Sequence, residues 1–258
     1  MSTIQSERLD HLMHIELCRP DAENRLTMAM LSALGRAFTE ADDDPTIRAV
    51  LLTGRGADFC TGADIQDALP AWAVGKNPFD VDQVNPFGVT GRKRRKPFVS
   101  VVHGRCMNGG LELALASDIC VAASDTRFAF QEIRFGTYPF AGGVFRLIRA
   151  AGWSSAMRLI LTAEEFGADE AHRLHVVAAV EPIEEARAAG LAIARRVSEA
   201  APLALQAAVA QAQAWADASD LAGFARSVPD ILRLLNSRDA AEAYRGMAEG
   251  RAPVFTGR

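Results

Sequence analysis

Residues 96–139 read KPFVSVVHGRCMNGGLELALASDICVAASDTRFAFQEIRFGTYP, and this stretch decides the fold. The run Phe98–Val102 is rich in β-branched residues and ends before a glycine, which is typical of a strand. Asn108, Gly109 and Gly110 follow, and the apolar residues after them predict a well-buried helix. A strand, a glycine turn and a helix in this order direct free backbone N–H groups toward an anion.

Two glutamates in the same stretch are candidates for proton transfer. Glu112 falls in the first turn of the expected helix, and Glu132 comes later, after two phenylalanines. Two carboxyl groups can share acid–base work if their surroundings hold them in different protonation states. The alternatives are a first-turn glutamate that the helix dipole favours, for Glu112, and an ordinary surface residue, for Glu132.

Length and composition indicate an ordinary globular protein. The 258 residues fit one large domain, or a domain with an appendage, and 49% of them are hydrophobic. A net charge of −4 argues against a nucleic-acid partner. No run is apolar enough to span a membrane, and the charged N-terminal residues are unlike a signal peptide. The four cysteines have no CxxC spacing, which predicts reduced thiols in a cytoplasmic protein.

The first half of the chain predicts alternating strands and helices. A strand over 12–17, a helix that begins after Thr27 and a strand over 49–52 give the order β-α-β, and a second round starts at Phe98. This order favours an α/β fold in which helices cover a sheet. Residues 66–92 contain three prolines among aromatic side chains, which indicates either a segment that folds over a site or a loop anchored by those aromatics.

The second half predicts a sheet that ends early and a long helical remainder. Two buried helices joined at Gly152 precede a final strand over 176–180. Beyond it the sequence is alanine-rich and helical in pattern. The expected helices cover 184–199, 203–218, 221–236 and 239–249.

Three other patterns suggest further functions. Gly54–Phe59 approaches the dinucleotide motif GxGxxG, so a nicotinamide-dependent oxidoreductase is an alternative, although a phenylalanine replaces the third glycine and no helical pattern follows. The five consecutive cations of Arg92–Lys96 either form a solvated face or bind phosphates. His172 and His175 share a helical face, but no further ligand has zinc-like spacing, so no metal site is predicted.

Four segments in register resemble the crotonase superfamily, also called the enoyl-CoA hydratase/isomerase family. They are Phe59–Asp64 (FCTGAD), Asn108–Asp118 (NGGLELALASD), Phe128–Gly143 (FAFQEIRFGTYPFAGG) and a segment that begins at Ser237 (SRDAAEAYRGMAEGRAPVF). The resemblance implies a crotonase-like spiral of β-β-α units over residues 1–195. It also implies a helical region over 196–258 that joins subunits into a homotrimer or a dimer of trimers.

The resemblance further implies hydration of an α,β-unsaturated acyl-CoA thioester, or the reverse dehydration, without a metal or redox cofactor. An oxyanion hole, formed by N–H donors fixed before charge develops, would stabilise the thioester oxygen. The hole and the two acid–base groups form the implied catalytic set: Ala63, Gly109, Glu112 and Glu132. The residues expected to contact coenzyme A are Asp64 and Ile65, beside the hole, and Arg94 and Arg95, in the basic run.

Several positions depart from the residues that are usual in the family. Asn108 replaces a glycine and still tolerates a positive φ angle, and Gln131 replaces a proline. Asp21, Met247 and Gly250 replace basic or aromatic side chains that contact the coenzyme in relatives. These last differences bear on how coenzyme A is held.

Large rings at two motif positions predict a short or narrow acyl pocket. Phe130 and Phe140 stand where smaller residues are common in the family. Other reactions of the family stay open, because the same hole serves isomerases, hydrolases, decarboxylases and dehalogenases. A catalytically weak relative that only binds or assembles is a further alternative.

Overall fold

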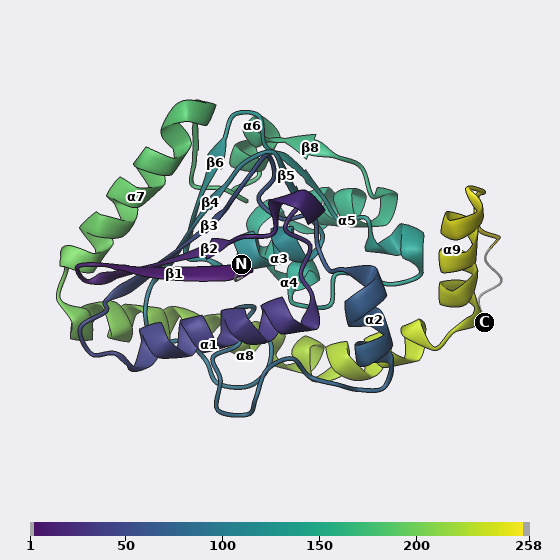
Figure 1. Cartoon of the computed structure of the whole chain (residues 1–258), viewed down its shortest axis with the longest axis horizontal. Helices are drawn as coiled ribbons and strands as arrows, with labels where there is room; N and C mark the ends of the chain where they lie inside the picture. The colour runs from purple at the N-terminus through teal and green to yellow at the C-terminus, as the bar shows by residue number, and fades with distance from the viewer. Residues whose placement is uncertain (1–2, 255–258) are drawn as a thin grey trace.

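A six-stranded sheet runs through the centre of the molecule (Figure 1). Its order is β1 (Ile4–Leu9), β2 (Leu12–Leu17), β3 (Ala49–Gly54), β4 (Phe98–Val102), β6 (Ile119–Ala123) and β9 (Ala179–Glu181). β1 and β2 pair antiparallel, and every later pair is parallel, so the chain needs crossover connections. The computed structural model describes residues 3–254 and, within them, all side chains except those of 218–230 and 234.

A second, three-stranded sheet makes the fold a spiral. It consists of β5 (Arg105–Met107), β7 (Arg127–Ala129) and β8 (Phe166–Gly167). The chain passes from β4 to β5 and then into helix α3 (Gly109–Ala116), and later from β6 to β7 and then into the short helix η2 (Glu132–Phe135). Each round gives one strand to each sheet and then a helix. This confirms the predicted crotonase-like α/β spiral of β-β-α units.

The first α-helix begins where the sequence predicts a cap. The short helix η1 covers Pro20–Ala22, and α1 covers Met28–Asp43. The Thr27 hydroxyl accepts a hydrogen bond from the Met30 N–H at 3.1 Å and so satisfies one free N–H of the first turn. A helix that the sequence did not predict, α2 (Ile65–Ala73), follows the glycine motif. It begins only after residues 60–63 have crossed to the second layer, so Gly54–Phe59 does not open a helix as a dinucleotide site requires.

Apolar side chains fill both faces of the main sheet. On one face they pack against α1, α3, α4 (Gly143–Ala151) and α5 (Trp153–Thr162), where the rings of Phe38 and Phe98 meet edge to face at 4.9 Å. Gly152, with a φ of 75°, joins α4 to α5 as predicted. On the other face α7 (Ile183–Glu199) lies close, because a Cβ on Gly190 would fall 2.1 Å from Val101.

The C-terminal region differs from its prediction in two respects. The last strand is Ala179–Glu181 rather than 176–180, because Val176 and Val177 turn into the core after α6 (Ala168–Arg173). One helix, α8 (Pro202–Leu235), replaces the two expected over 203–218 and 221–236. The predicted boundary at 195 falls inside α7, so the division into two regions stays a prediction.

The last helix returns to the middle of the chain. α9 (Arg238–Glu249) is capped by the Ser237 hydroxyl and packs against η2. The fit is tight, because a Cβ on Gly136, which ends η2, would lie 3.0 Å from the Ala240 Cα. Phe255, the last residue of the C-terminal motif, is outside the described residues.

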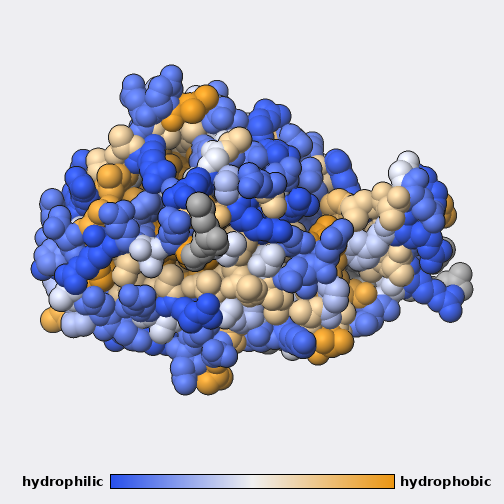
Figure 2. Space-filling view, viewed as in Figure 1, coloured by the Kyte–Doolittle hydropathy of each residue, from blue (hydrophilic) through white to orange (hydrophobic). Residues whose placement is uncertain are grey.

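One face of the molecule is largely hydrophilic (Figure 2). Figure 2 shows that hydrophilic residues cover most of this face, with hydrophobic ones scattered among them. Among the residues described, each helix is too short or too polar to cross a membrane.

Candidate active site

The N-terminus of α3 forms the centre of the candidate site. Asn108 has a φ of 53° and a ψ of −124°, and this turn directs the first residues of the helix away from β5. Gly110 must be a glycine, since a Cβ there would lie 2.2 Å from the Cys60 carbonyl oxygen. The helix therefore begins in contact with residues 60–63.

Ala63 and Gly109 lie side by side, as an oxyanion hole requires. A Cβ on Gly109 would be 3.9 Å from the Ala63 nitrogen. Ala63 sits in a parallel bridge in which the Leu26 N–H donates to the Gly62 carbonyl and the Asp64 N–H donates to the Leu26 carbonyl. This bridge leaves the Ala63 N–H unused, and in the described part of the chain neither it nor the Gly109 N–H has an acceptor. Two N–H groups without an acceptor thus lie close together.

Glu112 is buried one turn into α3. Its Oε1 accepts a hydrogen bond from the Gly143 N–H at 3.0 Å, at the start of α4. Burial raises the pKa of Glu112 to about 7, and the Gly143 hydrogen bond and the positive charge of Arg146 oppose part of that rise. Near neutral pH this carboxyl group can therefore either hold or accept a proton.

Glu132 opens η2 and shares its environment with Glu112. Its Oε2 is buried and has no hydrogen-bond partner among the described residues. Burial raises the pKa of Glu132 well above its usual range, and the charge of Glu112 raises it further. Burial and the neighbouring carboxyl group thus both favour the protonated form of Glu132.

Gly143 is a site residue that the sequence reasoning missed. It belonged to a quoted motif, but only the three-dimensional contact shows that its N–H holds Glu112. The sequence feature that could have revealed Gly143 is the glycine pair Gly142 and Gly143, because a glycine opens this helix as Gly109 opens α3. The ring of Phe130 packs beside it, because a Cβ on Gly143 would lie 2.7 Å from Phe130 Cζ.

The two phenylalanines expected to narrow the acyl pocket occupy different environments. Phe130 is 1% exposed and belongs to the main core, where it supports Gly143. Phe140 is half-buried and meets Trp72 of α2 edge to face at 5.2 Å between ring centroids. The segment 66–92 is anchored by its aromatic residues, with Phe87 buried and beside Phe79. The short or narrow acyl pocket expected from Phe130 and Phe140 stays a prediction.

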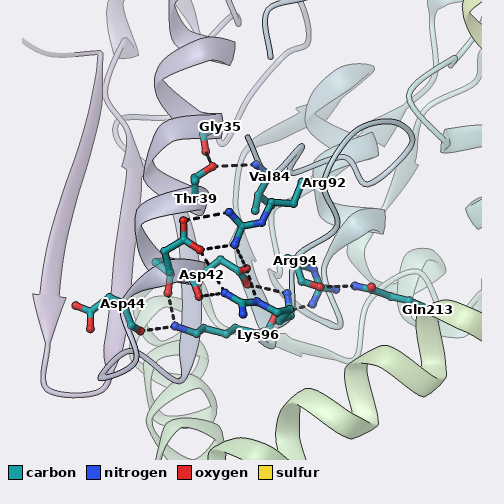
Figure 3. A network of polar contacts seen from close by, with 12 residues as sticks. Gly35, Thr39, Asp42, Asp44, Val84, Arg92, Arg94, Lys96 and Gln213 are labelled. Carbon is teal, nitrogen blue, oxygen red and sulfur yellow. Dashed lines mark hydrogen bonds and ion pairs between the residues drawn. The ribbon is translucent and has the colours of Figure 1, made fainter. Parts of the chain in front are cut away.

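The basic run is bound to acidic side chains of the same chain, as Figure 3 shows. We call Arg92–Lys96, together with Asp42–Asp44 at the end of α1, the basic clamp. Asp42 accepts from Arg92 at 2.7 Å and from Arg95 at 2.9 Å, and Lys96 Nζ donates to the carbonyl oxygens of Ala41 and Asp44. The cations thereby satisfy free carbonyl groups and the negative end of α1.

These contacts bear on the expectation that Arg94 and Arg95 contact coenzyme A. Arg94 donates to Asp118 at 2.6 Å, and Arg95 is held by Asp42. Phosphate binding by either arginine stays a prediction, and any phosphate would compete with these ion pairs. Asp64 caps α2 and pairs with Arg19 at 2.7 Å, and Ile65 is the first residue of α2, so their predicted contact with coenzyme A is also untested.

The remaining candidates lie apart from the glutamates. His172 and His175 are exposed and line a cavity of about 370 Å³ at the other end of α3. Within the described ranges, no three His, Cys, Asp or Glu side chains gather closely enough to hold a metal ion. His103 Nε2 donates to the Gly56 carbonyl oxygen at 2.9 Å, which is a structural contact.

Comparisons with known proteins match the chain over nearly its whole length. The family model described as enoyl-CoA hydratase/isomerase matches residues 7–258. An enoyl-CoA hydratase of Mycobacterium tuberculosis is 31% identical over all of both chains, and a 2,3-dehydroadipyl-CoA hydratase of Escherichia coli is 30% identical over the same extent. The crystal structure of a carnitinyl-CoA hydratase from Mycobacterium avium superimposes with a TM-score of 0.87, at 34% identity over 99% of each chain.

Proposed function

The chain belongs to the enoyl-CoA hydratase/isomerase family, and from that premise we propose that it adds water to an α,β-unsaturated acyl-CoA thioester or catalyses the reverse dehydration. One observation carries the proposal: two buried carboxyl groups with raised pKa values lie near two N–H groups that have no acceptor in the described part of the chain. Hydration needs both features, because protons must move while the thioester oxygen carries negative charge.

The proposed reaction begins at Glu112. Its pKa of about 7 lets it take a proton from water, whose oxygen then attacks the β-carbon of the substrate. The electrons of the double bond move toward the thioester carbonyl, and the N–H groups of Ala63 and Gly109 stabilise the resulting oxyanion.

Glu132 completes the addition. Its raised pKa keeps a proton that it donates to the α-carbon as the carbonyl re-forms. Water has then supplied the hydroxyl group, Glu112 holds a proton from water, and Glu132 is ionised. A net proton transfer from Glu112 to Glu132 restores both groups, so the cycle needs no metal and no redox cofactor, and the coenzyme A thioester is the substrate.

Two alternatives stay testable. An isomerase of the same family moves one proton between carbons and adds no water, so one glutamate suffices. A catalytically weak relative binds the thioester without turnover. The buried pair favours the hydratase, because an acyl-CoA-binding protein has no need for two carboxyl groups held at raised pKa values.

The decisive experiment is a panel of enoyl-CoA thioesters from short to long acyl chains. We expect loss of the absorbance of the conjugated thioester without added nicotinamide, with incorporation of oxygen from labelled water into the product. Double-bond migration without label uptake would identify an isomerase instead. Binding of the whole panel with no conversion would leave only the binding role.

The proposed partners follow from the family. Sequence reasoning predicts a homotrimer or a dimer of trimers in the cytoplasm, with no nucleic-acid partner. Sedimentation at micromolar protein measures the assembly directly, and a monomer under those conditions would contradict the prediction.

A further inference from the structure

Asn108 carries a side chain where the backbone favours glycine. Its φ of 53° with a ψ of −124° corresponds to the first central residue of a type II′ turn, a position usually taken by glycine. The Asn108 side chain packs tightly against Gly62, because a Cβ built on Gly62 would lie 2.8 Å from Asn108 Cβ. An asparagine in this conformation costs conformational free energy, so the question is what its amide does.

The amide joins two segments to the start of α3. Its Nδ2 donates to the Thr61 carbonyl oxygen at 3.2 Å, and its Oδ1 accepts from the Gln131 N–H at 2.7 Å. Because one partner is an acceptor and the other a donor, the orientation of the amide is fixed by its neighbours.

Each bonded segment carries a working group of the proposed site. Thr61 precedes Ala63 by two residues, Gln131 precedes Glu132 directly, and Asn108 itself precedes Gly109. One side chain therefore connects both oxyanion donors and the proposed acid. Its backbone is also engaged, since its N–H donates to the Ala129 carbonyl and its carbonyl accepts the Glu112 N–H, both at 2.9 Å.

The two nearby departures from the usual family residues form one hydrogen bond. A glycine at 108 would have no side-chain acceptor, and a proline at 131 would have no N–H to donate. This chain has both groups, and they meet at 2.7 Å. The two substitutions are thus physically matched.

We propose that Asn108 is a positioning residue that holds the N–H groups of Ala63 and Gly109 in register with Glu132. The inference rests on the proposed function, because it assigns a task to each of those groups. The proposal concerns an arrangement specific to this chain. The side-chain amide of Asn108 holds two segments together at a backbone position that favours glycine.

The test is Asn108→Gly. Glycine suits the backbone, so the folded state should be as stable as the wild type or more stable. Without the amide, we expect kcat to fall about 10- to 100-fold with a smaller change in KM, since a displacement of about 1 Å can cost about 100-fold. A protein that melts no earlier yet works more slowly distinguishes positioning from a purely structural role.

A spectroscopic readout separates this proposal from the hydratase proposal. A cinnamoyl-CoA thioester has an absorbance band that moves to longer wavelength when its carbonyl oxygen accepts hydrogen bonds. We expect a clear shift on wild-type protein and a smaller one on Asn108→Gly. If the wild type shifts the band but hydrates no thioester, the hydratase proposal fails. The difference in band shift between the wild type and Asn108→Gly still tests the role of Asn108.

A second variant and a matched control complete the design. Asn108→Asp keeps an acceptor for Gln131 but sets a carboxylate against the Thr61 carbonyl, so kcat and the band shift should also decrease. Asp10→Gly relieves a similar positive φ of 55° in the turn between β1 and β2 and should change neither. Full kcat and an unchanged band in Asn108→Gly or in Asn108→Asp would overturn the proposal.

Discussion

The basic clamp and the candidate site hold their ionisable side chains in opposite ways. In the basic clamp, Asp42 is bonded to two arginines, and the cations around it also have carboxylate or carbonyl partners. At the candidate site, Glu132 has a buried oxygen with no partner in the described chain, and Glu112 has one N–H donor. Paired charges hold segments together, whereas carboxyl groups left in an apolar environment keep a proton available for chemistry.

The largest expected effect is the loss of either glutamate. Glu112→Gln and Glu132→Gln keep the size of the side chain, so we expect thioester binding to survive while kcat falls by about 10²- to 10⁴-fold. The double variant should lose less than the product of the single losses, because groups that act as a unit are not additive. Steady-state kinetics with equilibrium binding measure both, and a full-rate Glu132→Gln enzyme would end the hydratase proposal.

The clamp should respond in stability rather than in rate. Asp42→Asn leaves Arg92 and Arg95 without their buried partner, and we expect a loss of about 1–3 kcal/mol in the free energy of unfolding. Asp43→Asn is the matched control, because Asp43 is 55% exposed and its ion pairs are worth less than about 1 kcal/mol. Denaturant unfolding measures the stability of both variants. A large drop in kcat for folded Asp42→Asn would contradict the prediction that the clamp affects stability rather than rate.

Rising pH should weaken the folded protein through the glutamates. The ordinary pKa of glutamate is 4.5, and that of Glu112 in the fold is about 7, so its contribution is complete below pH 4.5 and is lost as the pH rises through 7. We expect the wild-type Tm to fall between about pH 5 and pH 8, at roughly 2–4 °C for each kcal/mol. In Glu112→Gln the fall should be smaller, and an equal fall in both proteins would contradict the raised pKa.

The aromatic pair should affect substrate range. Phe140→Ala removes the ring that meets Trp72, so longer enoyl chains should gain about 10-fold in kcat/KM relative to short ones. The buried Phe130 is not a suitable comparison, because truncating it would open a hole in the core. A wild-type enzyme that already accepts long and short chains equally would show that the pair does not limit length.

The smallest expected effect concerns coenzyme A binding by the clamp. Neutralising Arg94 and Arg95 should raise KM if they contact phosphates, most visibly at low salt, where exposed charges are least screened. Since both are already bonded to aspartates, the structure favours only a modest rise. An unchanged KM at low ionic strength would leave the run with a structural role alone.

Local patterns made parts of this fold predictable. The strand Phe98–Val102, the cap at Thr27 and the turn at Asn108 are each encoded within a few neighbouring residues. β1 escaped prediction because it is an edge strand whose central residues are exposed, which leaves no alternating apolar pattern. The length of α8 was also missed, since nothing local distinguishes a continuous helix from two short ones.

The site was predictable only as a set of positions. Motif order located both glutamates, but the hydrogen bond from Gly143 to Glu112 spans 31 residues, and no spacing rule provides it. The basic run Arg92–Lys96 likewise shows that long-range contacts cannot be predicted from local sequence. A sequence displays five cations, whereas their partners on α1 lie about fifty positions earlier and are visible only in the fold.

The contact between α9 and η2 has a consequence for the order in which the protein becomes competent during its synthesis. A ribosome that has passed residue 132 has already made both glutamates and both oxyanion donors. The helix that η2 rests against, through Gly136 and Ala240, is made about a hundred residues later. A nascent chain would therefore carry both glutamates before the segment of Glu132 has its contact with α9.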